Sequence, residues 1–150
     1  MQLNALAAVA ALGAIAVASP AAAAVCVLVP GAAGQLGAPV DNYTRMSSED
    51  GGHQTSFTAL ISLGSSTITV GAPSVIYTGA HPHSGDTPAI RYSASGLLGS
   101  VKQQSLTSAQ TTFGINTLDG TVTAIVDGQI TNSSGFPQGD YTLRTVVTCS

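Results

Sequence analysis

The most concentrated group of potential ligands in the sequence is the segment HPHSGD, from His81 to Asp86. His-x-His spacing places two imidazoles on one side of an extended chain, and Asp86 adds a carboxylate, a combination that metal sites use. His53 would have to join from elsewhere in the chain. Pro, Ser and Gly in the same segment are residues that build surface loops. The candidate metal ligands are His81, His83 and Asp86. Because two ligands do not make a site, we expect a surface loop that binds no metal.

Nucleophilic hydrolysis requires a Ser or Cys beside a base, together with an oxyanion site. The sequence contains Ser, His and Asp residues, but no G-x-S-x-G motif that marks a nucleophile elbow. Oxygen ligands suited to calcium occur at Asp41, Glu49 and Asp50, without the D-x-D-x-D spacing of a calcium loop. We therefore predict that the protein is not an enzyme and needs no cofactor.

Two segments match the N-glycosylation pattern N-x-S/T, at Asn42 and Asn132. Both fall in segments where we expect loops. The pattern has a consequence only if the source is eukaryotic.

The two cysteines, Cys26 and Cys149, stand near the start of the expected mature chain and at its penultimate position. In an oxidising compartment two such cysteines pair most simply with each other. A bridge requires Cα atoms within about 7 Å, so the two ends of the domain would be neighbours, on adjacent or facing strands. The chain-entropy model gives about 4–5 kcal/mol for closing so long a loop. The alternative is that each thiol bonds to another subunit.

The first 18 residues carry no charge and are mostly small or aliphatic. This apolar stretch is shorter than the roughly 20 residues that a transmembrane helix needs. A Ser-Pro breaker follows, and Ala22 and Ala24 fit the A-x-A cleavage rule of secretory signal peptides. We therefore predict that residues 1–24 are a cleaved signal peptide and that residues 25–150 form one domain, secreted or at the cell surface, without a membrane span. The alternative is a membrane anchor that stays on the mature protein.

Charged residues make up only 7% of the sequence, against about 25% in an average soluble protein. The polar surface must therefore come mainly from Ser, Thr, Asn, Gln and Gly, a composition that fits extracellular β proteins. The net charge of −3 provides no basic patch, so we do not expect nucleic acid as a partner.

After residue 24 the hydrophobic pattern has period 2, which indicates strands whose side chains alternate between two faces. In the segment 141–149 the apolar residues share one face with Cys149, with Val146 as the exception, so we expect Cys149 to face the core. Strands rich in Val, Ile, Thr and Tyr are predicted at 25–29, 55–63, 67–70, 74–78, 89–94, 111–115, 121–126 and 129–131.

Turn signals separate these strands. Asp-Gly pairs at 119–120 and 127–128 predict tight hairpin turns. We expect a long loop or irregular arm over 30–54, and either a short helix or an edge strand within 97–109. Strands of this length with turn signals every 8–12 residues predict an all-β sandwich or barrel.

The segment 119–150, DGTVTAIVDGQITNSSGFPQGDYTLRTVVTCS, resembles the C-terminal part of bacterial pilin-like secreted domains, the group of spore coat protein U and related fimbrial subunits. In that group a Gly-x-Tyr opening, here Gly139-Asp140-Tyr141, starts a last strand of alternating Thr and Val. The resemblance implies an immunoglobulin-like or pilin-like antiparallel β-sandwich that polymerises by lending a strand to its neighbour. A bridge between the two ends departs from the group's pattern, and predicts a domain that completes its own sandwich.

The sequence therefore predicts a secreted structural or adhesive surface protein, a disulfide-closed sandwich that self-associates or forms a surface polymer. The alternative is an extracellular binding module for carbohydrate, metal or protein, which would use the loop 79–88 and the arm 30–54. A small hydrolase fits the sequence least.

Overall fold

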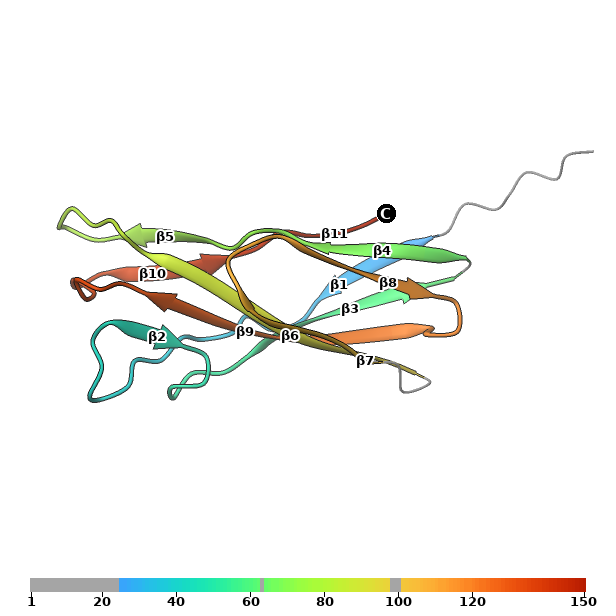
Figure 1. The fold of residues 1–150 in the computed structure, drawn as a ribbon, viewed down its shortest axis with the longest axis horizontal. Helices are drawn as coiled ribbons and strands as arrows, with labels where there is room; N and C mark the ends of the chain where they lie inside the picture. Colours follow the sequence, from blue (N-terminus) through green and yellow to red (C-terminus); the bar gives the residue numbers. More distant parts are fainter. Residues whose placement is uncertain (1–24, 63, 98–100) are drawn as a thin grey trace, which may run out of the picture.

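The computed structural model describes residues 25–62, 64–97 and 101–150, which form eleven strands in two packed layers (Figure 1). The described part contains no helix, so the predicted all-β, antiparallel sandwich is confirmed. The predicted signal peptide lies outside the described residues. The strands are β1 Cys26–Pro30, β2 Arg45–Ser47, β3 Thr55–Ile61, β4 Ser65–Val70, β5 Ser74–Thr78, β6 Thr87–Gly96, β7 Val101–Thr107, β8 Thr111–Asn116, β9 Thr121–Thr131, β10 Asp140–Arg144 and β11 Val147–Cys149.

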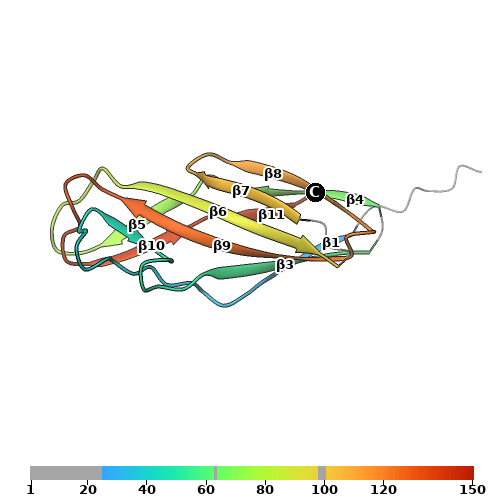
Figure 2. The ribbon, with the colours of Figure 1, turned by 60° about the horizontal axis from the view of Figure 1, so that its bottom comes forward.

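The first layer is an antiparallel sheet with the strand order β1-β3-β9-β6-β7, in which β9 also pairs with β2. β9 is its central strand. It pairs with β6 along one side, and with β3 and then β2 along the other. Figures 1 and 2 show that the molecule is elongated and that its strands run roughly along the long axis.

The second layer consists of the strand sets β8-β4-β11 and β5-β10, and a break in the strand pairing at residues 71–73 and 145–146 separates the two sets. At this break the Gly71 N–H donates to the Val146 carbonyl at 2.8 Å, and the Thr145 hydroxyl donates to the Gly71 carbonyl at 2.7 Å. The predicted strand 141–149 is therefore two strands. Val146 lies at the break between them and is exposed, which explains why it departs from the period-2 pattern.

The core lies between the layers and consists of alternate side chains from five strands. Full burial of an aliphatic or aromatic side chain contributes about 1.5–3 kcal/mol. The rings of Tyr92 and Phe113, 5.2 Å apart, connect the first layer to the second. The buried residues of this cluster are Phe57, Ala59, Ile68, Val70, Ile90, Tyr92, Ala94, Phe113, Ile115, Val122, Ala124 and Val126.

Two expected hairpin turns are not hairpins. Asp119-Gly120 does form a turn, with Gly120 at φ +61°, but it joins β8 of the second layer to β9 of the first. Asp127-Gly128 lies inside β9, which runs unbroken from Thr121 to Thr131. The strand continues because Asp127 and Gly128 pair with Arg91 and Ile90 of β6. The glycine makes room for a side chain across the sandwich, since a Cβ at position 128 would lie 2.5 Å from Cδ2 of Leu143.

The other expected elements take definite form. Within 97–109 the chain forms the edge strand β7 over the described residues, the second of the two predicted alternatives. The arm 30–54 is irregular apart from β2 and two isolated bridges. These bridges pair Gln35 with His53 and Gly37 with Ser47, so the segment 31–37 continues the edge of the first layer beyond β1.

Candidate binding groove

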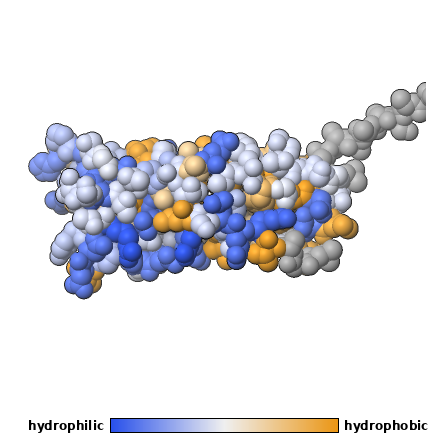
Figure 3. Space-filling model, viewed as in Figure 1, coloured by the Kyte–Doolittle hydropathy of each residue, from blue (hydrophilic) through white to orange (hydrophobic). Residues whose placement is uncertain are grey.

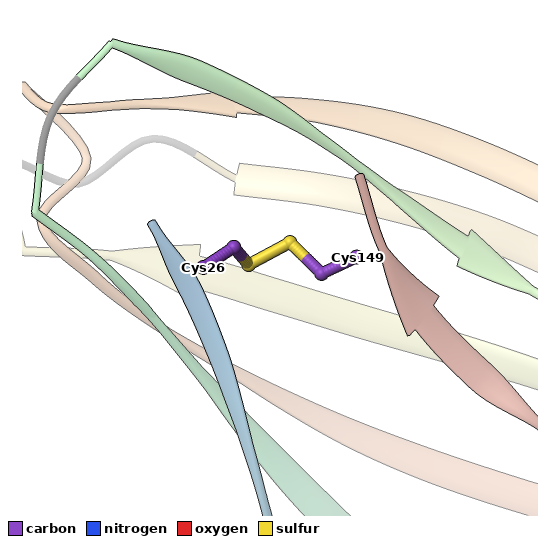
Figure 4. Close-up of a disulfide and its surroundings, with 2 residues drawn as sticks. All are labelled: Cys26 and Cys149. Atoms are coloured by element: carbon purple, nitrogen blue, oxygen red, sulfur yellow. A yellow bond between two sulfur atoms is a disulfide. The ribbon is translucent and has the colours of Figure 1, made fainter. Parts of the chain in front are cut away.

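Two edges, one from each layer, meet along one side of the sandwich, which we call the seam. The first layer contributes β1 and the segment 31–37, and the second layer contributes β11 and β10. At one end a disulfide between Cys26 on β1 and Cys149 on β11 closes the seam (Figure 4). The two Cα atoms are 6.1 Å apart, and both side chains pack against the core. The bridge expected from the sequence is therefore present within the chain, and it ties one layer to the other.

Beyond the disulfide the seam opens into a groove of about 760 Å³ between the segment 33–36 and β10. β2 and the residues that follow it supply one part of the wall, and β9 supplies the base. Both apolar and polar side chains line the groove, and its larger apolar ones are Leu36, Met46, Val126, Leu143 and Val146.

Gly128, at the base of the groove, leaves room for side chains from both edges of the seam. A Cβ at this position would meet Cδ2 of Leu143 at 2.5 Å and Cδ2 of Leu36 at 3.6 Å. Two leucines from opposite edges of the seam thus come together over the backbone of β9. Both side chains line the groove beside β9.

β10 presents an unpaired main-chain edge to this groove. Its five residues pair with β5, from Asp140 opposite Thr78 to Arg144 opposite Ser74. Within the described ranges no strand pairs with the other side of β10. Alternate N–H and C=O groups on that side therefore have no ladder partner, which makes the edge a template for another extended chain.

A polar cluster on the outer face of the first layer holds the arm that forms the groove wall. Asp127 is 8% exposed and accepts hydrogen bonds from Ser48 Oγ at 2.9 Å, Gln54 Nε2 at 3.0 Å and Arg91 Nε at 3.2 Å. Burial raises the pKa of Asp127, but these three hydrogen bonds outweigh it, and the net pKa lies below its ordinary value. The pKa of Arg91 is raised by its bond to Asp127 and by the charge of Glu49, which it also contacts.

The acidic residues considered as calcium ligands have other roles. Glu49 pairs with Arg91, and Asp50 pairs with Arg45 at 2.8 Å. Asp41 is exposed in the loop before β2. The ion pairs fix the segment that carries Met46 and His53 into the groove wall.

A second cluster lies where the loops 79–86 and 132–139 meet. His83 has a side chain that is only 6% exposed, and its Nε2 lies 2.7 Å from Oδ1 of Asp86. Asn132 Nδ2 donates to the same Asp86 oxygen at 3.0 Å and to the Ser84 carbonyl at 2.9 Å. The imidazole of His83 packs among the aromatic rings of Tyr77, Tyr141 and Phe136. The distances between ring centroids are 4.9 to 6.3 Å.

These contacts correct the reading of the HPHSGD segment. The structure brings His83 and Asp86 together but leaves His81 exposed, while His53 lines the groove. No group of three or more His, Cys, Asp or Glu that could hold a metal ion occurs in the part of the chain described. The expectation of a surface position holds for His81, whereas His83 is a buried member of an aromatic cluster.

The sequence did contain a signal for this cluster. Tyr77, Phe136 and Tyr141 are three of only seven aromatic residues in the chain, and two glycines, Gly79 and Gly139, stand beside them. A Cβ on either glycine would strike the Tyr77 ring, at 2.3 Å or 2.4 Å. The Tyr141 hydroxyl donates to the Pro137 carbonyl at 2.9 Å, and the pKa of that hydroxyl is raised, first by burial and then by the nearby Tyr77 and Asp86.

Comparison with known proteins adds no relative: no family model, no curated protein and no solved structure matches the chain. Among the described residues, no helix has the length and apolar character needed to cross a membrane.

Proposed function

We propose that the protein is a secreted structural or adhesive surface protein whose domains associate along the seam. The observation that carries this proposal is the unpaired edge of β10 beside an apolar groove. An extended chain added there would bond to the main chain of β10, and every second side chain would enter the groove. Such addition links domains without a catalytic centre or a cofactor.

The surface of the domain supports association at an edge rather than through a broad apolar face. On the face shown in Figure 3, hydrophobic residues form small separate patches among polar ones. A longer apolar row lies on the outer face of the first layer, where Val25, Val27 and Val29 are exposed and Leu60 stands opposite Val27. Main-chain pairing at the seam supplies direction, and such exposed aliphatic side chains supply further contact area.

The position of the disulfide also favours this reading. It holds β1 and β11 in the sandwich, so the domain stays closed at one end while the groove remains open at the other. Addition of a strand from another molecule is therefore favoured over exchange of these two strands.

The test is to fractionate the native source and to determine the mass of the purified mature protein by size-exclusion chromatography with light scattering. We expect surface-bound or assembled material. Ala33→Arg places a charged side chain in the groove and should release monomers. Ala109→Arg, at an exposed position between β7 and β8, is the matched control and should leave assembly unchanged. A wild-type protein that is monomeric and entirely free in the medium would contradict the proposal.

A second candidate function is an extracellular binding module at the loop end of the sandwich. Asn132 joins three loops there, since its N–H donates to the Thr44 carbonyl at 3.0 Å and its side chain donates to Ser84. The loop that ends at Thr44 exposes Val40 by 86% and Tyr43 by 77%. A preorganised tip with an exposed aromatic ring suits a sugar or protein ligand. Loss of glycan or protein binding in Tyr43→Ala, with unchanged assembly, would favour this candidate.

A further inference from the structure

We infer that the strand that pairs with β10 is β10 of a second copy, in a two-fold antiparallel dimer. This inference rests on the proposed association along the seam and names its partner. The strand β10 has the sequence Asp-Tyr-Thr-Leu-Arg, from Asp140 to Arg144. It carries opposite charges at its two ends and Thr142 at its centre.

Antiparallel pairing centred on Thr142 makes this strand complementary to itself. Asp140 of each copy then lies opposite Arg144 of the other, and the two Thr142 residues face each other on the two-fold axis. Oppositely charged cross-strand pairs stabilise a sheet, and like-charged pairs destabilise it. Closed two-fold symmetry repeats each contact twice, as isologous dimers do.

Both charges are available for such pairing. Asp140 and Arg144 are exposed, and neither forms an ion pair inside the described part of the domain. The other two arginines form ion pairs within the domain. Arg45 pairs with Asp50, and Arg91 pairs with Glu49 and Asp127. Among the described residues no acid pairs with Arg144, while a second copy offers one at the matching position.

The same charges disfavour the alternatives. Parallel pairing in register would set Asp140 beside Asp140 and Arg144 beside Arg144. A slip of one residue would separate the opposite charges and turn the side chains to the wrong faces. Of the edge strands described, only β10 carries opposite charges at symmetric positions. β1, β5, β8 and β11 have no charged residue, β2 has only Arg45 and β7 has only Lys102.

The dimer would also cover the groove. Tyr141 and Leu143 are half-buried and point inward, whereas Asp140, Thr142 and Arg144 are exposed. In the antiparallel pair, Tyr141 of one copy lies opposite Leu143 of the other on the groove side. The second layers of the two copies would become one continuous sheet, and the two grooves would face each other.

Charge reversal tests the pairing. Asp140→Arg and Arg144→Asp each replace two attractive pairs by two repulsive ones, so each variant alone should self-associate at least about tenfold more weakly. An equimolar mixture of the two variants should form a heterodimer, because every opposed pair is then Asp with Arg. The double variant with both substitutions should regain the wild-type dimer. Light scattering and native mass spectrometry of the mature protein give these readouts, and the recovery on mixing shows that both single variants are folded.

A cross-link tests the position of the axis. Directly opposite residues of an antiparallel pair have Cα atoms about 4.5–5.5 Å apart, within the range that a disulfide spans. Thr142→Cys should therefore give a covalent dimer on mild oxidation. Thr112→Cys, at an exposed position on the edge strand β8, is the matched control and should not.

The outcomes separate this inference from the proposed function. A wild-type protein that assembles, with charge variants that assemble equally well, overturns the two-fold pairing and leaves association along the seam standing. A wild-type protein that remains monomeric at its highest soluble concentration overturns the pairing and the association together. Recovery of that monomer from the cell surface would still support an adhesive role.

Discussion

Asp127 is a carboxylate in the middle of a strand, and its hydrogen bonds decide where the arm lies. Ser48 and Gln54, from the loop between β2 and β3, and Arg91, from β6, all donate to it. The Asp-Gly pair predicts a turn because that local signal is the same whether or not distant residues donate hydrogen bonds to the aspartate. The partners of Asp127 lie up to 79 residues away in the chain and are not visible in a local pattern.

Asp127→Asn should lower the free energy of unfolding at neutral pH by about 1–3 kcal/mol, because an amide replaces a charged acceptor of three hydrogen bonds. The folded state depresses the pKa of Asp127. Its stabilisation is therefore present above the unfolded pKa of about 3.9 and is lost as pH falls through the lower folded value. Urea unfolding at a series of pH values should show the two proteins converging in acid. Asp41→Asn, at an exposed loop position, is the control and should change little.

His83 and His81 are two residues apart in one loop, yet they should respond differently to substitution. His83→Ala removes a buried ring from the aromatic cluster and one of the two side chains that contact the Asp86 carboxylate, so we expect a loss of about 2–4 kcal/mol. His81→Ala should stay within about 0.5 kcal/mol, the usual range for an exposed loop. Thermal and urea unfolding of the two variants measure this difference. Equal small effects would show that the His83 cluster does not stabilise the loop end.

At the scale of elements, the sequence pattern located the strands better than their connections. The segment 74–78 was predicted with the bounds of β5, and the alternation of 141–149 placed Cys149 inward as observed. Two of the features that the pattern missed, the unbroken β9 and the break between β10 and β11, depend on contacts between distant segments. β9 continues because Asp127 and Gly128 pair with β6, and at the break Gly71 bonds to Val146. Contacts between segments so far apart in the sequence leave no local signal.

Gly128→Ala tests the packing of Leu143 on the backbone of β9. The added methyl would lie 2.5 Å from Cδ2 of Leu143, so that side chain must turn into the groove. Because only the end of a flexible side chain has to move, we expect a loss of about 1 kcal/mol, the low end of the cost of overpacking. Gly114→Ala in β8 is the control, since its methyl meets nothing within 4 Å. Equal stability changes at both positions in urea unfolding would rule out the contact with Leu143 as the reason for the glycine.

At the scale of the whole molecule, the sandwich differs along the seam: a covalent bond closes one end and a groove opens the other. Cysteine count and position were enough to predict the closed end. The groove was not predictable, because it depends on how Leu36, Met46 and Leu143 meet from three segments that the sequence separates widely. The proposed function therefore rests on the part of the molecule that only the three-dimensional arrangement reveals.

The bridge should matter most for the first strand. β1 is an edge strand of five residues whose one partner among the described strands is β3, and its outward valines are exposed. Removing both cysteines, by Cys26→Ala with Cys149→Ala, should lower the free energy of unfolding by about 2–5 kcal/mol, the usual cost for small secreted domains. With the tie to β11 gone, β1 should become the first strand to exchange its amide protons, well before the central strand β9. Hydrogen exchange with mass spectrometry compares the two strands in one experiment. Peptide mapping of the wild type without reductant checks that a disulfide links the peptides that contain Cys26 and Cys149. If β1 in the double variant stays as protected as β9, the disulfide is not what holds the edge of the first layer in place.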